Sequence, residues 1–225
     1  MLSWEQVQAA VRPLRLIFWG GILWLIDFSF SSTTNGEGFR CDVLDDTVGT
    51  VLITVALFRL SAAPVPGRYA SVMFAIKVIA ICSVVETVIK HFIFPHPAPL
   101  DFIFGVLGLA QLLGTVLFCM AMKWFCIDAG MIQVAESWRV TFLLFCFLNA
   151  LPLGLLNLAS MFAMITDSSF HVNLGPAGLL LLPVILLPLI HLFISTSRMR
   201  RAAEVGLTSP PGGFPVVLPS DSSSD

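Results

Sequence analysis

Six long apolar stretches alternate with short polar segments along the chain. They cover residues 14–30, 47–63, 69–94, 102–123, 140–165 and 177–197. A helix that crosses the hydrocarbon core of a bilayer needs about 20 mostly apolar residues, and most of these stretches reach that length. The pattern therefore predicts an all-α fold, a polytopic transmembrane helical bundle with about six spans. Residues 47–63 are short and follow two aspartates, so a tilted or re-entrant segment is the alternative there.

The N-terminal region carries its own helix signal. The segment from Ser3 to Gln6 fits a capping box, in which the serine and the glutamine satisfy each other's backbone amides. We expect Pro13 to end this helix, so residues 1–13 are predicted to form an amphipathic helix in the membrane interface. No A-x-A site follows the first apolar run, so we expect that run to be retained as a span.

The remaining polar regions are the C-terminal tail and one long connection. Residues 14–201 make up the predicted transmembrane domain. Residues 202–225 are rich in Pro, Gly and Ser and are predicted to be a disordered cytoplasmic tail. Residues 123–139 either form a second interfacial segment or continue the fourth span as a helix. Both alternatives stay open from the sequence.

The basic residues indicate which side of the membrane each connection faces. Nine of the 12 lie next to alternate gaps and two next to the other gaps, while Lys77 lies inside a span. Because cytoplasmic loops of membrane proteins carry an excess of Lys and Arg, the pattern places both termini in the cytoplasm. We expect a bacterial cytoplasmic membrane.

Composition supports this class and excludes others. The chain is 57% hydrophobic and only 12% charged, with a mean hydropathy of +0.91. A soluble domain of 225 residues could not bury that much apolar surface, whereas a bilayer accepts it on the lipid-facing side. The net charge of −2 argues against nucleic acid, which requires a basic surface. The five cysteines contain no C-x-x-C pair, so no disulfide framework is implied.

Ionisable residues inside the spans are the first candidates for a functional site. Each charge in the membrane core costs about 2.5–3.5 kcal/mol on insertion scales and so needs a partner or a role. Lys90, four residues after Glu86, is the expected partner of that carboxylate. Lys77 either reaches Asp27, if the first and third spans are neighbours, or extends toward the interface. These groups predict a proton or cation path, with structural pairing as the alternative.

Polar and small residues also follow helical spacing. Gly108, Gln111, Thr115 and Cys119 form a narrow stripe along the fourth span, as is typical of close, hydrogen-bonded helix contacts. In the fifth span a proline lies between two asparagines, and the sixth span holds two prolines. Kinks at such prolines can open a polar pocket. The intramembrane candidates are therefore Asp27, Lys77, Glu86, Gln111, Asn149 and Asn157.

The predicted outer side is acidic and carries three of the four histidines. Asp42, Asp45 and Asp46 form a cluster in one loop, but their spacing matches no EF-hand. We expect Asp45 and Asp46 to stabilise the positive N-terminal end of the second span. No histidine spacing indicates haem or zinc, so we predict no metal and no cofactor.

A resemblance is carried by Ile22-Leu-Trp-Leu-Ile-Asp27 and by Asp46-Thr-Val-Gly49, which opens a leucine-rich helix ending near Leu60. These segments resemble uncharacterised small polytopic bacterial membrane proteins, in which a D-x-x-G opens a helix after a polar loop. The resemblance covers about a quarter of the chain. It implies a membrane protein without an established activity and adds weight to Asp46 and Gly49.

No nucleophile elbow, P-loop, zinc-protease or dinucleotide motif is present, so we do not predict an enzyme. The sequence predicts an integral membrane protein that handles a small solute or an ion. The alternative is a non-catalytic structural or assembly protein, which binds a membrane-protein partner or a second copy of itself through its polar stripes. The lipid bilayer is a partner in either case.

Overall fold

The computed structural model describes residues 4–25, 29–34, 37–42, 46–63, 65, 67–93, 97–166 and 177–208. The helices in it are α1 (Trp4–Leu25), α2 (Asp46–Ser61), α3 (Arg68–Phe92), α4 (Ala98–Asp128), α5 (Ile132–Leu144), α6 (Leu151–Ile165) and α7 (Ala177–Thr208). A π-helical segment, η1 (Phe145–Ala150), joins α5 to α6 in one continuous rod. The predicted helical class is confirmed, and each apolar stretch overlaps a described helix or helical rod.

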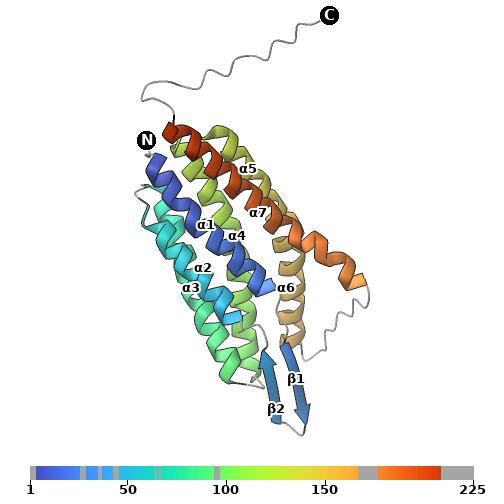
Figure 1. Cartoon of the computed structure of the whole chain (residues 1–225). Helices are drawn as coiled ribbons and strands as arrows, with labels where there is room; N and C mark the ends of the chain where they lie inside the picture. Colours follow the sequence, from blue (N-terminus) through green and yellow to red (C-terminus); the bar gives the residue numbers. More distant parts are fainter. Residues whose placement is uncertain are drawn as a thin grey trace, which may run out of the picture.

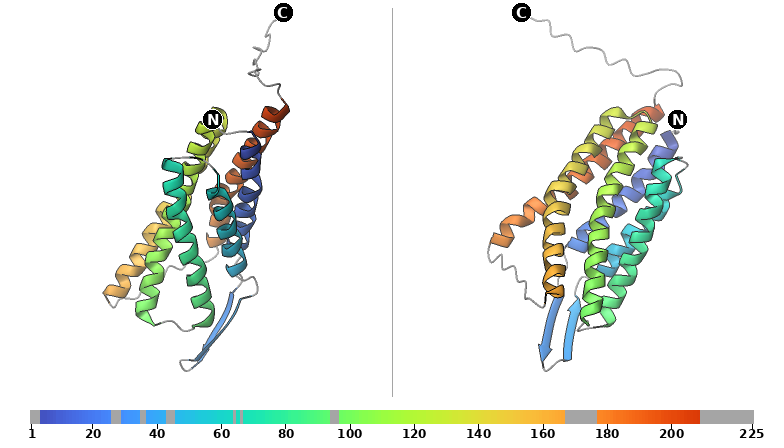
Figure 2. Two further views of the ribbon diagram at one scale, coloured as in Figure 1. Left: turned by 90° about the vertical axis from the view of Figure 1, so that its left-hand side faces the viewer. Right: turned by 180° about the vertical axis from the view of Figure 1, so that it is seen from behind.

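The helical rods run up and down along one long axis (Figures 1 and 2). Going round the bundle, α1 packs against α2, α2 against α3, α3 against α4, and α4 against α5 and α6, while α7 packs against α5 and α1. The beginning of α1 and the end of α7 lie at the same end of the bundle, called here the terminal end (Figure 1). A β-hairpin extends from the opposite end, called here the hairpin end.

The hairpin consists of β1 (Ser29–Thr34) and β2 (Glu37–Asp42), paired antiparallel with Ser29 opposite Asp42. The sequence predicts a span that reaches residue 30, and that boundary is wrong, because α1 ends at Leu25. Asn35-Gly36 separates the strands in the sequence, and this pair is the usual signal for a two-residue hairpin loop. The threonines and the phenylalanine of β1 favour a strand, and the turn signal favours a hairpin.

The first helix does not end at Pro13, which corrects the predicted boundary between residues 1–13 and the first span. A proline in a helix removes one hydrogen bond and costs about 3 kcal/mol. The helix continues because one face is buried on both sides of the proline, with Val7, Ala10, Leu14 and Ile17 each at most 8% exposed. Packing of that continuous face offsets the break.

The turn between α4 and α5 explains why α4 ends at Asp128. Gly130 has a positive φ of 76°, its N–H bonds the carbonyl of Ile127, and the next N–H bonds the carbonyl of Cys126. These two bonds form a Schellman motif, which ends a helix at a glycine. Two alternatives were open for residues 123–139, and the structure favours continuation of the fourth span as a helix. That helix continues only to Asp128, and a new helix begins at Ile132.

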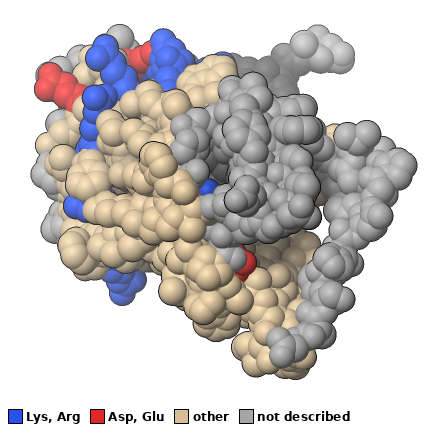
Figure 3. Space-filling model, turned by 90° about the horizontal axis from the view of Figure 1, so that it is seen from below, with Lys and Arg blue, Asp and Glu red and all other residues tan. Residues whose placement is uncertain are grey.

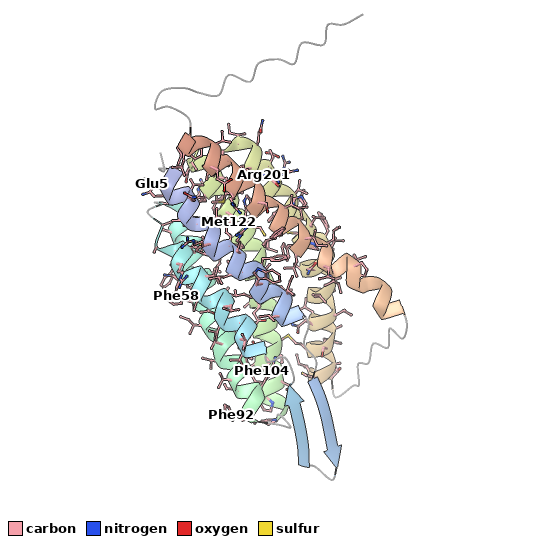
Figure 4. All side chains as sticks on the ribbon, in the orientation of Figure 1. Glu5, Phe58, Phe92, Phe104, Met122 and Arg201 are labelled. Atoms are coloured by element: carbon pink, nitrogen blue, oxygen red, sulfur yellow. The ribbon has the colours of Figure 1, made fainter. Side chains whose placement is uncertain are left out.

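The last helix runs on to Thr208, so the predicted tail of residues 202–225 begins inside α7, and residues 209–225 lie outside the described part. The last turns of α7 pack on α1. Gly206 faces the ring of Trp4 so closely that a Cβ at position 206 would overlap the ring. Figure 4 shows Glu5 and Arg201 together at this terminal end.

Apolar side chains cover much of the outer surface. Within the described residues, three helical stretches are long and apolar enough to cross a membrane, namely Arg68–Lys90, Ala98–Asp128 and Ile132–Ile165, and Thr47–Ser61 is a shorter apolar helix. Phe74 and Phe162 are 65% and 68% exposed. Seen from the hairpin end, most of the described surface is uncharged (Figure 3). Such a surface suits lipid rather than water.

Candidate functional site

The most buried carboxylate of the described spans lies between α3 and α4. Glu86 is 4% exposed and faces α4 from the last third of α3. Lys90 Nζ lies 2.6 Å from Glu86 Oε1, which is the i+4 pair that the sequence predicts. Gln111 Nε2 of α4 donates to Glu86 Oε2 at 2.6 Å. The three side chains are called here the Glu86 cluster.

The Glu86 cluster is balanced in charge and in hydrogen bonds. Each carboxylate oxygen accepts one short bond, one from an ammonium and one from an amide, and bonds of this charge-assisted kind are roughly twice as strong as neutral ones. Lys90 also lies 4.8 Å from the ring centre of Phe104, whose position toward the hairpin end is visible in Figure 4. The Lys90 side chain is 40% exposed, whereas that of Glu86 is 5% exposed. The cation can therefore reach solvent or headgroups while the carboxylate cannot.

Lys77 lies on a different face of α3 and faces α2. Its Nζ is 5.5 Å from the ring centre of Phe58 and 5.9 Å from that of Phe74, and both rings are largely exposed. Phe58 lies in the last turn of α2, so the Lys77 side chain extends from the middle of α3 toward the terminal end of the bundle. This geometry is that of a snorkelling lysine. Asp27, the alternative partner considered from the sequence, lies outside the described residues.

Two asparagines of the α5–η1–α6 rod occupy different environments. Asn157 Nδ2 donates to the Gly105 carbonyl of α4 at 3.1 Å. A Cβ at Gly108 would lie 2.7 Å from the same Nδ2, so this approach requires glycine. The small-residue stripe predicted on α4 therefore serves a contact inside the bundle. Asn149 lies in η1, and its buried Oδ1 accepts no hydrogen bond from the described residues.

The π-helical register of η1 is tied to Pro152. The Leu151 N–H bonds the Cys146 carbonyl five residues back, and Pro152 has no N–H to continue an α-helical ladder. Single π-turns of this kind are rare in helices and occur often at functional sites. The proline in this span was identified from the sequence, but the change of register was not.

The predicted outer acidic cluster is described only in part. The backbones of Asp42 and Asp46 end β2 and begin α2, while their side chains and Asp45 lie outside the described residues. His96 and His171 also lie outside. In the part of the chain that the structure describes, no group of three or more His, Cys, Asp or Glu side chains is placed to hold a metal ion.

A second polar cluster, which the sequence did not predict, lies between α5 and α7. Ser195 Oγ is 2.8 Å from Ser137 Oγ and 2.9 Å from Thr141 Oγ1, and all three residues are at most 3% exposed. His191 Nδ1 is 2.9 Å from Thr141 Oγ1. Arg198 donates to Ser137 Oγ at 3.3 Å. We call this set the hydroxyl–histidine cluster.

One arrangement of protons is consistent with the hydrogen bonds of the three hydroxyls in the hydroxyl–histidine cluster. Thr141 donates to the Ser137 carbonyl at 3.1 Å, so its oxygen accepts from Ser195 and from His191 Nδ1. Ser137 then donates to Ser195 and accepts from Arg198. The chain of bonds leads from Arg198 to His191. A sequence signal for this cluster was available. Ser137 and Thr141 are spaced i+4 on one helix, and His191 and Ser195 are spaced i+4 on another.

Comparison with protein families, with curated proteins and with solved structures gives no match. The resemblance to small bacterial membrane proteins, based on Asp27, Asp46 and Gly49, therefore stays a prediction. Independently of the resemblance, α1 and α2 approach closely, because a Cβ at Gly20 of α1 would lie 2.8 Å from the Gly49 carbonyl oxygen. The fold and surface define the chain as a helical protein compatible with a membrane.

Proposed function

We propose that this chain is a multi-pass protein of a cell membrane. Its six rods, with α5, η1 and α6 counted as one, would cross the bilayer, and both termini would lie in the cytoplasm. The apolar surface of α3, α4 and the α5–η1–α6 rod supports insertion. The excess of Lys and Arg near the terminal end supports the orientation, by the positive-inside rule.

We further propose that the protein handles protons or a small cation at the Glu86 cluster. The observation that carries this proposal is a carboxylate 4% exposed inside an apolar helix pair, held by a lysine that is not itself buried. A neutral pair of amides would join α3 and α4 at a lower desolvation cost. Ionisable residues inside membranes mark ion and proton pathways more often than simple packing sites.

The cluster offers a physical route for exchange. In a low-dielectric site the Glu86 carboxylate needs one nearby positive charge, and Lys90 supplies it in this structure. If Lys90 moves toward the interface, a proton or a small cation can take its place without leaving an unpaired charge. Gln111 holds the carboxylate in position from α4 throughout. Lys90 and the cation would then occupy the site alternately.

The test uses purified full-length protein in sealed vesicles that contain a pH-sensitive or sodium-sensitive dye. A potassium diffusion potential drives the flux. We expect the wild type and the lipid-facing control Leu113→Ala to conduct and Glu86→Gln to fall to the rate of protein-free vesicles. No wild-type flux of protons or sodium above that rate would refute ion handling.

A role as an assembly partner, or as a homo-oligomer, is the second proposal. The exposed face of α6 favours this role. Outside its own rod, α6 packs mainly against α4, which leaves Leu155 and Phe162 59% and 68% exposed. A partner helix could cover this face. Purification in mild detergent is the test, because a stable complex or dimer supports the role and a clean monomer counts against it.

A further inference from the structure

A hollow of about 270 Å³ opens near the terminal end, between the start of α3 and the end of α4. It is lined by Arg68, Tyr69, Trp124, Ile127 and Asp128. It lies away from the Glu86 cluster, which is in the last third of α3 and the middle of α4. Ion handling does not use it.

The aromatic part of the hollow is held in place. Tyr69 is 1% exposed, and its hydroxyl donates to the Leu60 carbonyl at 2.9 Å. Its ring centre is 5.7 Å from that of Phe125. Trp124, which is half-buried, forms another part of the wall. Tyr and Trp are the residues enriched where membrane proteins meet the headgroup region.

Two opposite charges lie on the two sides of the hollow. Arg68 comes from α3 and Asp128 from α4, and both side chains are exposed. No ion pair joins them in the described part of the chain, so each remains able to bind a ligand group. A guanidinium suits a phosphate, and a carboxylate beside an indole face suits an ammonium.

We propose that this hollow binds a phosphate ester that carries a primary ammonium, namely the headgroup of phosphatidylethanolamine. Arg68 binds the phosphate, and Asp128 and Trp124 bind the ammonium. A primary ammonium donates hydrogen bonds to Asp128, whereas a trimethylammonium cannot, so the site discriminates against phosphatidylcholine. Ile127, 48% exposed at the edge, provides an apolar surface for the start of the acyl chains. This inference rests on the proposed membrane placement but not on ion handling.

The test is native mass spectrometry of the full-length protein, extracted from membranes and mixed with equal amounts of phosphatidylethanolamine, phosphatidylcholine and phosphatidylglycerol. We expect preferential retention of phosphatidylethanolamine. Arg68→Ala and Asp128→Asn should each weaken it about tenfold, the effect of losing one charge-assisted hydrogen bond. Arg139→Ala, an exposed arginine away from the hollow, is the matched control and should retain wild-type binding.

Equal binding of the three lipids by a membrane-integrated chain, or binding unchanged in both variants, would overturn this assignment alone. Displacement of the lipid by soluble phosphoethanolamine at equal concentration would assign the hollow to a free metabolite and overturn the lipid as its ligand. A chain recovered outside the membrane fraction would overturn the membrane placement together with this assignment. These outcomes separate failure of the hollow from failure of the proposed function.

Discussion

The Gln111 amide of α4 donates to the Glu86 carboxylate of α3 across a distance of 2.6 Å. This bond joins residues 25 positions apart in the chain and fixes how α3 and α4 are aligned along their common axis. Lys90 occupies the other oxygen, so Gln111 is the only cross-helix donor that the described residues give to this carboxylate. Removing it tests the cluster without removing a charge.

Gln111→Leu should lower the free energy of unfolding by about 1–3 kcal/mol, because it leaves a buried acceptor with one bond fewer. Thermal unfolding of the purified protein in detergent measures the loss. Leu113→Ala, at an outward position 56% exposed, is the control and should change stability much less. Equal melting temperatures for Gln111→Leu and the wild type would show that this bond contributes nothing.

The two lysines within α3, Lys77 and Lys90, should respond differently to replacement. Lys77→Met should preserve accumulation and thermal stability, because within the described residues the Lys77 ammonium lies over the rings of Phe58 and Phe74 and forms no ion pair. Lys90→Met should destabilise by about 1–3 kcal/mol, because Glu86 then lacks its positive partner. Expression level and melting temperature of the two variants are compared directly. A more harmful effect at Lys77 would contradict the snorkelling geometry.

The crossing of α1 and α2 should depend on Gly20. A Cβ there would lie 2.8 Å from both the Gly49 carbonyl oxygen and Ile53 Cγ1, so Gly20→Ala should cost about 1–3 kcal/mol through overpacking. Gly154→Ala is the matched control, since its Cβ would meet Leu112 at an ordinary 3.9 Å. Thermal unfolding of both variants measures the two losses. A Gly154→Ala variant less stable than Gly20→Ala would contradict the close packing of α1 against α2 at Gly20.

The hydroxyl–histidine cluster predicts coupling between α5 and α7. Thr141→Val and Ser195→Ala remove the same 2.9 Å bond, so their effects on stability should be less than additive. Each change should cost about 0.6 kcal/mol and at most about 1.7 kcal/mol, the average and the maximum for hydrogen bonds between membrane helices. A double-mutant cycle in thermal unfolding measures the coupling. Strict additivity would mean that the two hydroxyls do not interact.

Local apolar runs were sufficient to place the helices, because a helix of about 20 apolar residues is recognisable without knowing its neighbours. Boundaries were less predictable. Pro13 indicates a helix end, yet burial of Val7 and Leu14 on one face carries α1 through it. The hairpin of β1 and β2 was overlooked although Asn35-Gly36 is a recognisable turn signal.

From the sequence, side-chain contacts could be predicted within one helix but not between two helices. The Glu86–Lys90 pair follows from i+4 spacing and is confirmed. Gln111 was identified as a polar position, but its partner depends on α3 and α4 being neighbours, which apolar periodicity does not specify. The same limit applies to His191, whose hydrogen-bond partner Thr141 lies on α5 and could be found only once α5 and α7 were known to be neighbours.

The most direct test of the membrane placement is the accessibility of introduced cysteines in intact cells that express the full chain, compared with the Cys41→Ser protein that has no introduced cysteine. Cys41→Ser removes the thiol of β2, and the other four native thiols lie within α3, α4 and η1. Exposed Ala98 at the start of α4 marks the hairpin end, and exposed Ala62 just after α2 marks the terminal end. With a membrane-impermeant maleimide, we predict that Ala98→Cys reacts at once and that Ala62→Cys reacts only after permeabilisation. Reaction of both positions in intact cells, or of Ala62→Cys alone, would contradict the proposed crossing and orientation.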